Sequence, residues 1–251
     1  MNIIVSGWPG VGQSTLAIIL AKTLDYKLLQ GSATFRYLGS LINLENTGAD
    51  RITADELLEP NWGPIFEKYM QWIANNQQHV ITETDISGFF TKENPNVYSV
   101  FLQASQAVRK ERLVKDGRAK DVDFIEKRDE SLAKAYMDLF NVDFLNTDKI
   151  KENYSRPLNN AELSIEKELK IIYTDLKNLN ALSEEEFNTL TLNAATEEQC
   201  YWKNGKQYYL DILKERNKLP IAADIIKHII QIFPEDIKKL PQELKDIIAK
   251  I

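Results

Sequence analysis

A glycine-rich segment near the start of the chain, GWPGVGQST (residues 7–15), most strongly limits the folds that this sequence can adopt. It follows a short apolar run at residues 3–6 and precedes LAIILAKTL (residues 16–24), whose apolar residues recur at helical spacing. A strand, a glycine-rich turn and a helix in this order form the context in which a phosphate-binding loop is recognised. The sequence therefore predicts such a loop, in which backbone amides turn toward a phosphate.

The segment matches the pattern G-x-x-x-x-G-K-[ST] except at Gln13, where a lysine is expected. A lysine places a positive charge beside the transferred phosphoryl group, whereas glutamine offers an uncharged amide donor of similar reach. Losing one well-placed donor to a transition state costs about 3 kcal/mol, but backbone binding of phosphates does not need this side chain. We therefore expect ATP and Mg²⁺ to bind here, with Ser14 as the Mg²⁺ ligand. The expected nucleotide-binding residues are Gly7, Pro9, Gly10, Val11, Gly12, Gln13, Ser14 and Thr15.

Composition narrows the class of protein further. A chain of 251 residues, 43% of them hydrophobic, can form one large domain, or a domain of about 180 residues with an appendage. Its net charge of -6 argues against a general nucleic-acid binder, which needs a basic surface. The single Cys200 cannot form an internal disulfide, and no apolar stretch approaches the ~20 residues that span a bilayer. We expect a cytoplasmic protein without a membrane partner.

Residues 1–180 alternate short apolar runs with helical patterns, which is typical of an α/β fold. We expect a three-layer phosphate-loop fold around a parallel sheet of about five strands. The predicted strands fall within residues 3–6, 26–31, 79–85, 97–104 and 153–160, and Pro157 confines the last to an edge or an end. With Ser32 as a cap and Pro60 as a first residue, the predicted helices cover residues 14–24, 32–44, 60–75, 105–115, 121–140 and 163–179.

From residue 181 the chain is predicted to be a helical extension, residues 181–251, without recognisable strands. Ser183 and Glu186 form an S-x-x-E capping box at its entry. Apolar faces recur in residues 223–233 and 241–251. These faces can pack on the first domain, pair with a second copy of the chain or bind a protein partner, and the sequence leaves all three open.

An aromatic-rich segment, CYWKNGKQYYLDIL (residues 200–213), lies inside this extension. Aromatic and lysine side chains together can form a partner or nucleic-acid surface. Core aromatics beside a turn at Asn204 and Gly205 explain the segment more simply, and we expect Trp8 of the glycine-rich loop to pack in the same way.

The predicted third strand ends in TETD, which places Glu83 and Asp85 two positions apart. Side chains alternate along a strand, so these two carboxylates point to the same side. The carboxyl end of a parallel strand lies beside the phosphate loop in folds of this kind. There the pair can hold the water shell of Mg²⁺ or accept a hydroxyl proton.

Residues 1–179 resemble the P-loop nucleoside monophosphate kinases, in particular the short cytidylate kinase type. The resemblance implies an ATP- and Mg²⁺-dependent phosphotransferase, with an acceptor monophosphate held by Arg36 in GSATFRYLG and by residues around Glu83. Family members follow the acidic residue with a glycine–arginine pair, whereas this chain has Thr84 and Asp85. Asp85 is therefore a candidate for both acceptor binding and catalysis, and the acceptor itself is left open.

The segment VRKERLVKDGRAKDVDF resembles the lid of this family, here around residues 112–128, which closes arginines over the transferred phosphate. Where the family usually has an arginine before a tyrosine, this chain has Ala135. The resemblance implies catalytic roles for Arg112, Arg118 and Arg128, with Arg109, Lys115 and Lys120 nearby. In YSRPLNNAELS it implies that Asn159 and Asn160 contact the base of the nucleotide donor.

Three functions remain open at this point. The first is a phosphotransferase of the monophosphate-kinase kind, with CMP or dCMP as acceptor by resemblance. The second is a non-catalytic nucleotide-binding module that acts on a partner through its C-terminal helices. It is favoured by Gln13, Asp85 and Ala135, each of which removes positive charge from around the phosphates. The third is a kinase that acts on another small molecule.

Overall fold

One parallel sheet of five strands forms the centre of the molecule. The computed structural model describes residues 1–41, 58, 60–115 and 124–251. The strands are β1 (Asn2–Gly7), β2 (Lys27–Gln30), β3 (Val80–Glu83), β4 (Val97–Gln103) and β5 (Arg156–Asn159). They pair in the order β2-β3-β1-β4-β5, and every pairing is parallel. The expected five-stranded parallel sheet is confirmed.

The position of each strand follows from its residues. β1 carries the β-branched run Ile3, Ile4 and Val5, is buried along its whole length and lies at the centre of the sheet. Strands that are buried on both faces read as continuous apolar runs of this kind. β5 lies at an edge of the sheet, as Pro157 predicts, because proline has no N–H to donate to a second neighbour.

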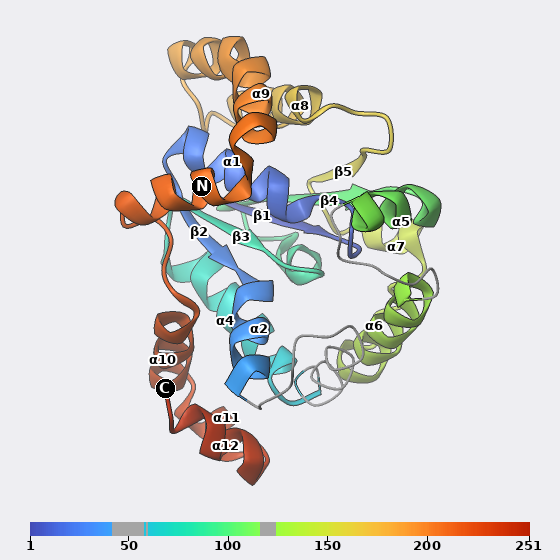
Figure 1. Cartoon of the computed structure of the whole chain (residues 1–251), viewed down its shortest axis with the longest axis vertical. Helices are drawn as coiled ribbons and strands as arrows, with labels where there is room; N and C mark the ends of the chain where they lie inside the picture. The colour runs from blue at the N-terminus through green and yellow to red at the C-terminus, as the bar shows by residue number, and fades with distance from the viewer. Residues whose placement is uncertain (42–57, 59, 116–123) are drawn as a thin grey trace.

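Helices cover both faces of the sheet (Figure 1). The core on one face contains Ile3 and Val5, packed with α1 (Gln13–Leu24), α8 (Ile165–Asn178) and α9 (Glu184–Glu215). On the other face Ile4 packs with Ala74 of α4 (Gly63–Asn76), and Phe101 lies in a cluster with residues of α6 (Phe124–Phe140) and α7 (Thr147–Lys151). The remaining elements before β5 are α2 (Gly31–Leu41), the 3₁₀ helix η1 (Ser87–Thr91) and α5 (Gln106–Lys115).

The C-terminal helices pack on the sheet domain itself. Ala194, Tyr201 and Tyr209 of α9 belong to the same core as β1 and α1. The rest of the region is α10 (Ala222–Ile232), α11 (Pro234–Lys238) and α12 (Gln242–Ile248). Ile226 and Leu244 of these helices lie in the core formed by α2 and α4. Of the three arrangements that the sequence leaves open, the apolar faces therefore adopt packing on the first domain.

Two predicted helix starts differ in the structure. Ser32 was expected to cap its helix, but α2 already begins at Gly31, so Ser32 lies in the first turn. Pro60 and Asn61 are helical as predicted, but a turn at Trp62 separates them from α4, which begins at Gly63 with Pro64 in its first turn, where a missing N–H costs nothing. The capping box of Ser183 and Glu186 is confirmed at the start of α9.

The turn expected at Asn204 and Gly205 is instead a break within α9. Gly205 has a φ of 76° and a ψ of 175°, and helical residues continue on both sides. A side chain at this φ is strained, so glycine allows the helix to change direction here. The expected aromatic core is confirmed for Tyr201 and Tyr209, whereas Trp202 is 65% exposed.

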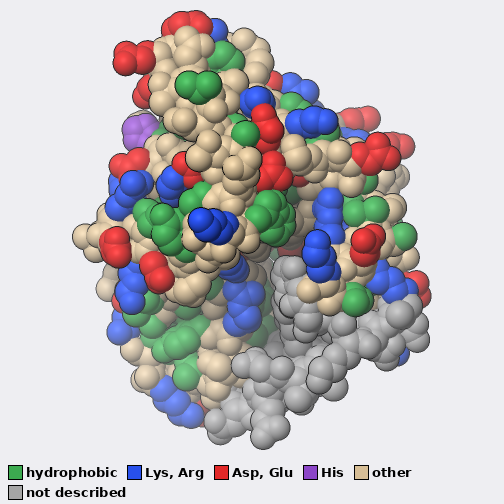
Figure 2. Space-filling view, turned by 45° about the horizontal axis from the view of Figure 1, so that its top comes forward, with side chains coloured by type: hydrophobic (Ala, Val, Ile, Leu, Met, Phe, Trp, Pro, Cys, Tyr) green, Lys and Arg blue, Asp and Glu red, His purple; other side chains and the backbone are tan. Residues whose placement is uncertain are grey.

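Charged side chains of both signs are mixed on the surface that Figure 2 shows, where lysines and arginines alternate with aspartates and glutamates. Within the described ranges, every helix is too short or too polar to cross a membrane.

A buried carboxyl group on α4 makes stability depend on pH. Glu67 is only 7% exposed, and burial raises its pKa from 4.5 to about 8, with a further contribution from the charge of Asp85. Between these two pH values the unfolded chain loses the Glu67 proton while the folded chain keeps it. The free energy of unfolding therefore falls as pH rises from about 4.5 to about 8. Below this range Glu67 is protonated in both states and causes no pH dependence.

We predict that Glu67→Gln removes this pH dependence. Relative to the native protein, the free energy of unfolding of the variant should rise by several kcal/mol between about pH 5 and about pH 8. Urea unfolding at a series of pH values measures this difference. Glu93→Gln, at an exposed position, is the control and should run parallel to the native profile. A Glu67→Gln profile that also runs parallel would contradict the prediction.

Candidate functional site

The glycine-rich loop connects β1 to α1, and two of its glycines are required by the backbone. Gly10 has a φ of 82°, and a Cβ there would lie 2.9 Å from the Leu113 side chain. Gly12 has a φ of 102° and is the residue that precedes α1. Having no side chain, Gly12 cannot cap the first amides of the helix, which leaves them to an anion.

Two arginines of α5 hold the outer side of this loop. Arg109 Nη1 donates to the carbonyl oxygen of Pro9 at 3.0 Å, and Arg112 Nη1 donates to that of Val11 at 2.9 Å. In a trans peptide the carbonyl and the following N–H point in opposite directions. Fixing these two carbonyls toward α5 therefore turns the N–H groups of Gly10 and Gly12 to the opposite side, as an anion-binding loop requires.

Arg109 also fixes the position of α6. It is 5% exposed and makes a bidentate ion pair with Asp129, with N–O distances of 3.0 and 2.5 Å. Its guanidinium lies 5.5 Å from the ring centre of Trp8, which packs on Phe144 as expected for a core residue. A pair this buried is held in one geometry, so the loop, α5 and α6 form a single rigid support.

Gln13 is turned toward protein groups. Its side chain is 6% exposed, and Nε2 donates to the carbonyl oxygen of Gly7 at 3.0 Å and to Asp85 Oδ1 at 3.4 Å. The other carboxylate oxygen of Asp85 accepts a hydrogen bond from the Tyr136 hydroxyl at 3.4 Å. The neutral amide and the aspartate are thus partners beside the loop, at the position where the motif expects a positive charge.

Ser14 meets the second carboxylate. Its hydroxyl donates to Glu83 Oε1 at 3.0 Å, and the hydroxyl of Ser32 donates to Glu83 Oε2 at 3.2 Å. Glu83 is 3% exposed at the end of β3. Glu83 and Asp85 therefore approach the neighbouring residues Ser14 and Gln13, as predicted, although β3 ends at Glu83 and Asp85 lies in the bend that follows it. Hydroxyl and carboxylate oxygens are the ligands that Mg²⁺ prefers, so this donor set fits the expected ion.

The arginines that the sequence predicts for the site lie on different helices and in different surroundings. Arg112 lies in α5 and is fixed to the loop, so it does not belong to a separate lid segment. Arg128 is half-buried on α6, and its Nε has no hydrogen-bond partner within the described residues. Arg118 and Lys120 lie outside the described residues. Arg36 is exposed on α2, one helical turn after Ser32.

The two asparagines at the end of β5 have different roles: Asn159 is its last residue and Asn160 follows it. Asn160 is 2% exposed; its Nδ2 donates to the Val11 carbonyl at 2.9 Å, and its backbone oxygen accepts from Arg112 at 2.8 Å. It therefore joins the end of β5 to the loop. Asn159 is exposed and accepts a bond from the Ala161 amide at 3.2 Å, which is turn chemistry.

A buried glutamate lies behind this network. Burial raises the pKa of Glu168 on α8 to about 7, against the opposing effects of Asn160 and Arg112. In the bonds described above, Arg112 is held by carbonyl and amide oxygens only.

Three contacts of the site were not foreseen. Asp129 pairs with Arg109 twenty positions away, Tyr136 reaches Asp85, and the Tyr201 hydroxyl lies 3.0 Å from the Thr15 hydroxyl. The sequence holds a signal for Tyr201 only as a core aromatic. The sequence does not identify the ion-pair partner of a charged residue on a predicted helix, because the partner depends on how two helices pack.

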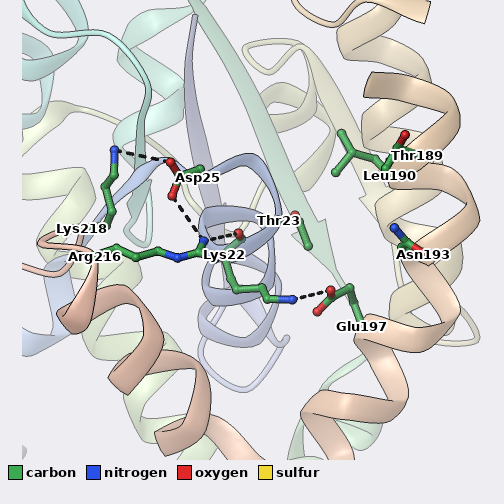
Figure 3. Close-up of a pocket in the computed structure, with 9 residues that line it drawn as sticks. All are labelled: Lys22, Thr23, Asp25, Thr189, Leu190, Asn193, Glu197, Arg216 and Lys218. Atoms are coloured by element: carbon green, nitrogen blue, oxygen red, sulfur yellow. Dashed lines mark hydrogen bonds and ion pairs between the residues drawn. The ribbon is translucent and has the colours of Figure 1, made fainter. Parts of the chain in front are cut away.

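A cavity lies at the other end of α1, away from the loop (Figure 3). It has a volume of about 740 Å³ and lies between the C-terminal end of α1 and α9. Its charged lining residues are already paired, Lys22 with Glu197 and Arg216 with Asp25. These ion pairs therefore connect the C-terminal end of α1 to α9.

Comparison with known proteins finds one matching family model and several similar proteins. Residues 3–134 match a family model described as an AAA domain. A cytidylate kinase from Methanosarcina barkeri is 29% identical over 151 residues, which cover 57% of this chain and 80% of that protein. A cytidylate kinase from Sulfurisphaera tokodaii is also 29% identical over 151 residues, covering 57% of this chain and 79% of that protein.

Solved structures with partial likeness include a shikimate kinase from Bacteroides thetaiotaomicron, with a TM-score of 0.43 and 16% identity over 72% of this chain and 99% of that chain. A gluconokinase from Sinorhizobium meliloti has a TM-score of 0.37 and 15% identity, over 80% of this chain and 96% of that chain. The family model, in contrast, matches more than half of the chain and includes the loop, both carboxylates and α5. This protein therefore belongs to the AAA-domain family that this model describes.

Proposed function

We propose that this protein is an ATP-dependent phosphotransferase whose acceptor is a nucleoside monophosphate, with CMP or dCMP as the expected substrate. The observation that carries the proposal is the meeting of two carboxylates with the first residues of α1: Asp85 with Gln13 and Glu83 with Ser14. The relatives that bear the name cytidylate kinase support this acceptor class.

The phosphates of ATP bind at the loop and the N-terminal end of α1. The N–H groups of Gly10 and Gly12 face away from the arginines of α5, and the helix end adds a partial positive charge. Arg112 adds positive charge on the outer side of the loop, where it acts on the phosphates at longer range than the missing lysine would. It lies against the loop, and its described hydrogen bonds go to uncharged oxygens. Arg109 contributes less, because Asp129 already neutralises it.

The residues that would hold Mg²⁺ are Ser14 and Glu83. Bound there, the ion would neutralise negative charge on the phosphates. Ser32 helps to orient the Glu83 carboxylate, since its hydroxyl donates to the oxygen that Ser14 does not use. Arg36 lies one turn farther along α2 and is the proposed contact to the acceptor phosphate.

The transfer makes one bond and breaks one. An oxygen of the acceptor monophosphate bonds to the γ-phosphorus of ATP, while the bond from that phosphorus to the leaving oxygen of ADP breaks. An ionised phosphate oxygen needs no base, so Asp85 serves here to hold Gln13. A hydroxyl acceptor is the second candidate, because the half-buried Asp85 carboxylate at the end of β3 can accept a hydroxyl proton.

We predict acceptor-dependent ADP formation from Mg-ATP with CMP or dCMP, measured against AMP, GMP, UMP and a set of sugar and polyol acceptors. Activity with CMP or dCMP should exceed the rate without acceptor at least about tenfold. Ser14→Ala should lower this activity, because it removes the hydroxyl proposed for Mg²⁺.

Other outcomes decide between the candidates. Turnover with a hydroxyl acceptor alone would replace the monophosphate proposal with the second candidate. Binding of Mg-ATP by calorimetry without turnover of any acceptor would contradict both, and would favour a nucleotide-dependent binding module.

We predict that Gln13→Lys alone gives little gain in activity. Asp85 Oδ1 lies 3.4 Å from Gln13 Nε2, so a lysine amine at this position would pair with the Asp85 carboxylate instead of the phosphates. With Asp85→Asn in place, the same lysine substitution should raise kcat by about a hundredfold, the usual worth of one well-placed donor. Steady-state kinetics of the four proteins in this cycle test it.

The single Asp85→Asn variant is the reference for the double variant. Equal gains from the lysine in the presence and absence of Asp85 would show that the carboxylate does not capture the amine. A gain in neither background would contradict a catalytic role for position 13.

A further inference from the structure

A pair of hydroxyls connects the C-terminal region to the phosphate loop. Thr15 is the last residue of the loop motif. Its Oγ1 lies 3.0 Å from the hydroxyl oxygen of Tyr201 on α9. The two residues are 186 positions apart in the chain. Tyr201 is 7% exposed, and its ring packs near Tyr209 with 5.4 Å between ring centres. The proposed kinase reaction uses no residue of α9.

α9 is fixed along the whole of α1, so this contact has a defined position. Toward the C-terminal end of α1, Lys22 forms an ion pair with Glu197 of α9, and Arg216 pairs with Asp25 at 3.3 Å (Figure 3). The Tyr209 hydroxyl donates to the backbone oxygen of Glu197 at 2.7 Å. Contacts at both ends of α1 hold α9 in register with the phosphate loop.

The chemistry of the two hydroxyls gives the contact a direction. A phenol is a stronger acid than an aliphatic alcohol, so Tyr201 is the better donor and Thr15 Oγ1 the better acceptor. When the phenol donates, the proton of Thr15 is available to a third group. Thr15 is in the first turn of α1, where the helix end and the loop amides bind an anion. A phosphate oxygen of the nucleotide is the acceptor that this site offers.

We propose that Tyr201 is a positioning residue of the nucleotide site: its hydroxyl donates to Thr15 Oγ1 and directs the Thr15 proton toward a phosphate of the bound nucleotide. This inference rests on the proposed nucleotide-binding function. It makes α9 part of the nucleotide site, because the phosphate contact of Thr15 is oriented from the C-terminal region.

A double-mutant cycle on nucleotide affinity tests the proposal. The dissociation constant of Mg-ADP is measured by calorimetry for the full chain, Tyr201→Phe, Thr15→Val and the double variant. Tyr201→Phe should weaken binding about fivefold in the native background, the effect of one oriented hydrogen bond. It should change binding less than twofold when Thr15→Val has already removed the hydroxyl.

Two controls separate positioning from a structural role. Tyr209→Phe removes another buried hydroxyl of α9, and should lower the melting temperature while leaving the dissociation constant within twofold of native. Thr15→Ser keeps a hydroxyl at the contact, so its affinity for Mg-ADP should still fall when Tyr201→Phe is added. This variant also keeps the test valid if Thr15→Val does not fold.

The contrary results are distinct. Native affinity in Tyr201→Phe would overturn the inference and leave the proposed function intact. An equal loss with and without the Thr15 hydroxyl would also overturn it, since Tyr201 would then act by another route. Failure of the native chain to bind Mg-ADP or Mg-ATP would overturn the nucleotide-binding function and this inference with it.

Discussion

The site depends on the hydrogen bonds from α5 arginines to the carbonyl oxygens of the phosphate loop. Arg109 and Arg112 hold Pro9 and Val11 from the outer side, which turns the intervening amides inward. The same two guanidiniums reach Asp129 on α6 and the end of β5. A glycine-rich loop is flexible by itself, so its anion-binding shape is stabilised by these charged donors and by the burial around them.

Charge around the loop is arranged unusually for its motif. Where a lysine is expected, Gln13 is bonded to Asp85, and the nearby positive charge comes from Arg112, whose described bonds are to neutral oxygens. An amide bonded to a carboxylate is compatible with burial, because the hydrogen bond compensates the amide for its lost water. The loop therefore has a neutral amide at its α1 end and an arginine against its outer side on α5.

The C-terminal helices extend both cores of the domain. α9 shares the core of α1 and α8, and α10 and α12 share that of α2 and α4. Amphipathic helices need an apolar surface to cover, and here the domain itself supplies it. In consequence α1 is held by the sheet on one side and by α9 on the other, which places Tyr201 beside Thr15. The extension and the phosphate site are thus mechanically connected.

The sequence by itself determined where the strands lie and which local features would meet at the loop. Apolar runs located the first four strands, the segment around Pro157 predicted β5 and its edge position, and the spacing of Glu83 and Asp85 predicted that both would face the loop. These features are local, because they depend on side-chain alternation and on backbone N–H groups within a few residues. Only the tertiary structure decided the partners: Asp129 for Arg109, Asp85 for Gln13 and Tyr201 for Thr15. Such contacts join segments 20 to 186 positions apart, and their geometry is set by how helices and strands pack, which no local periodicity encodes.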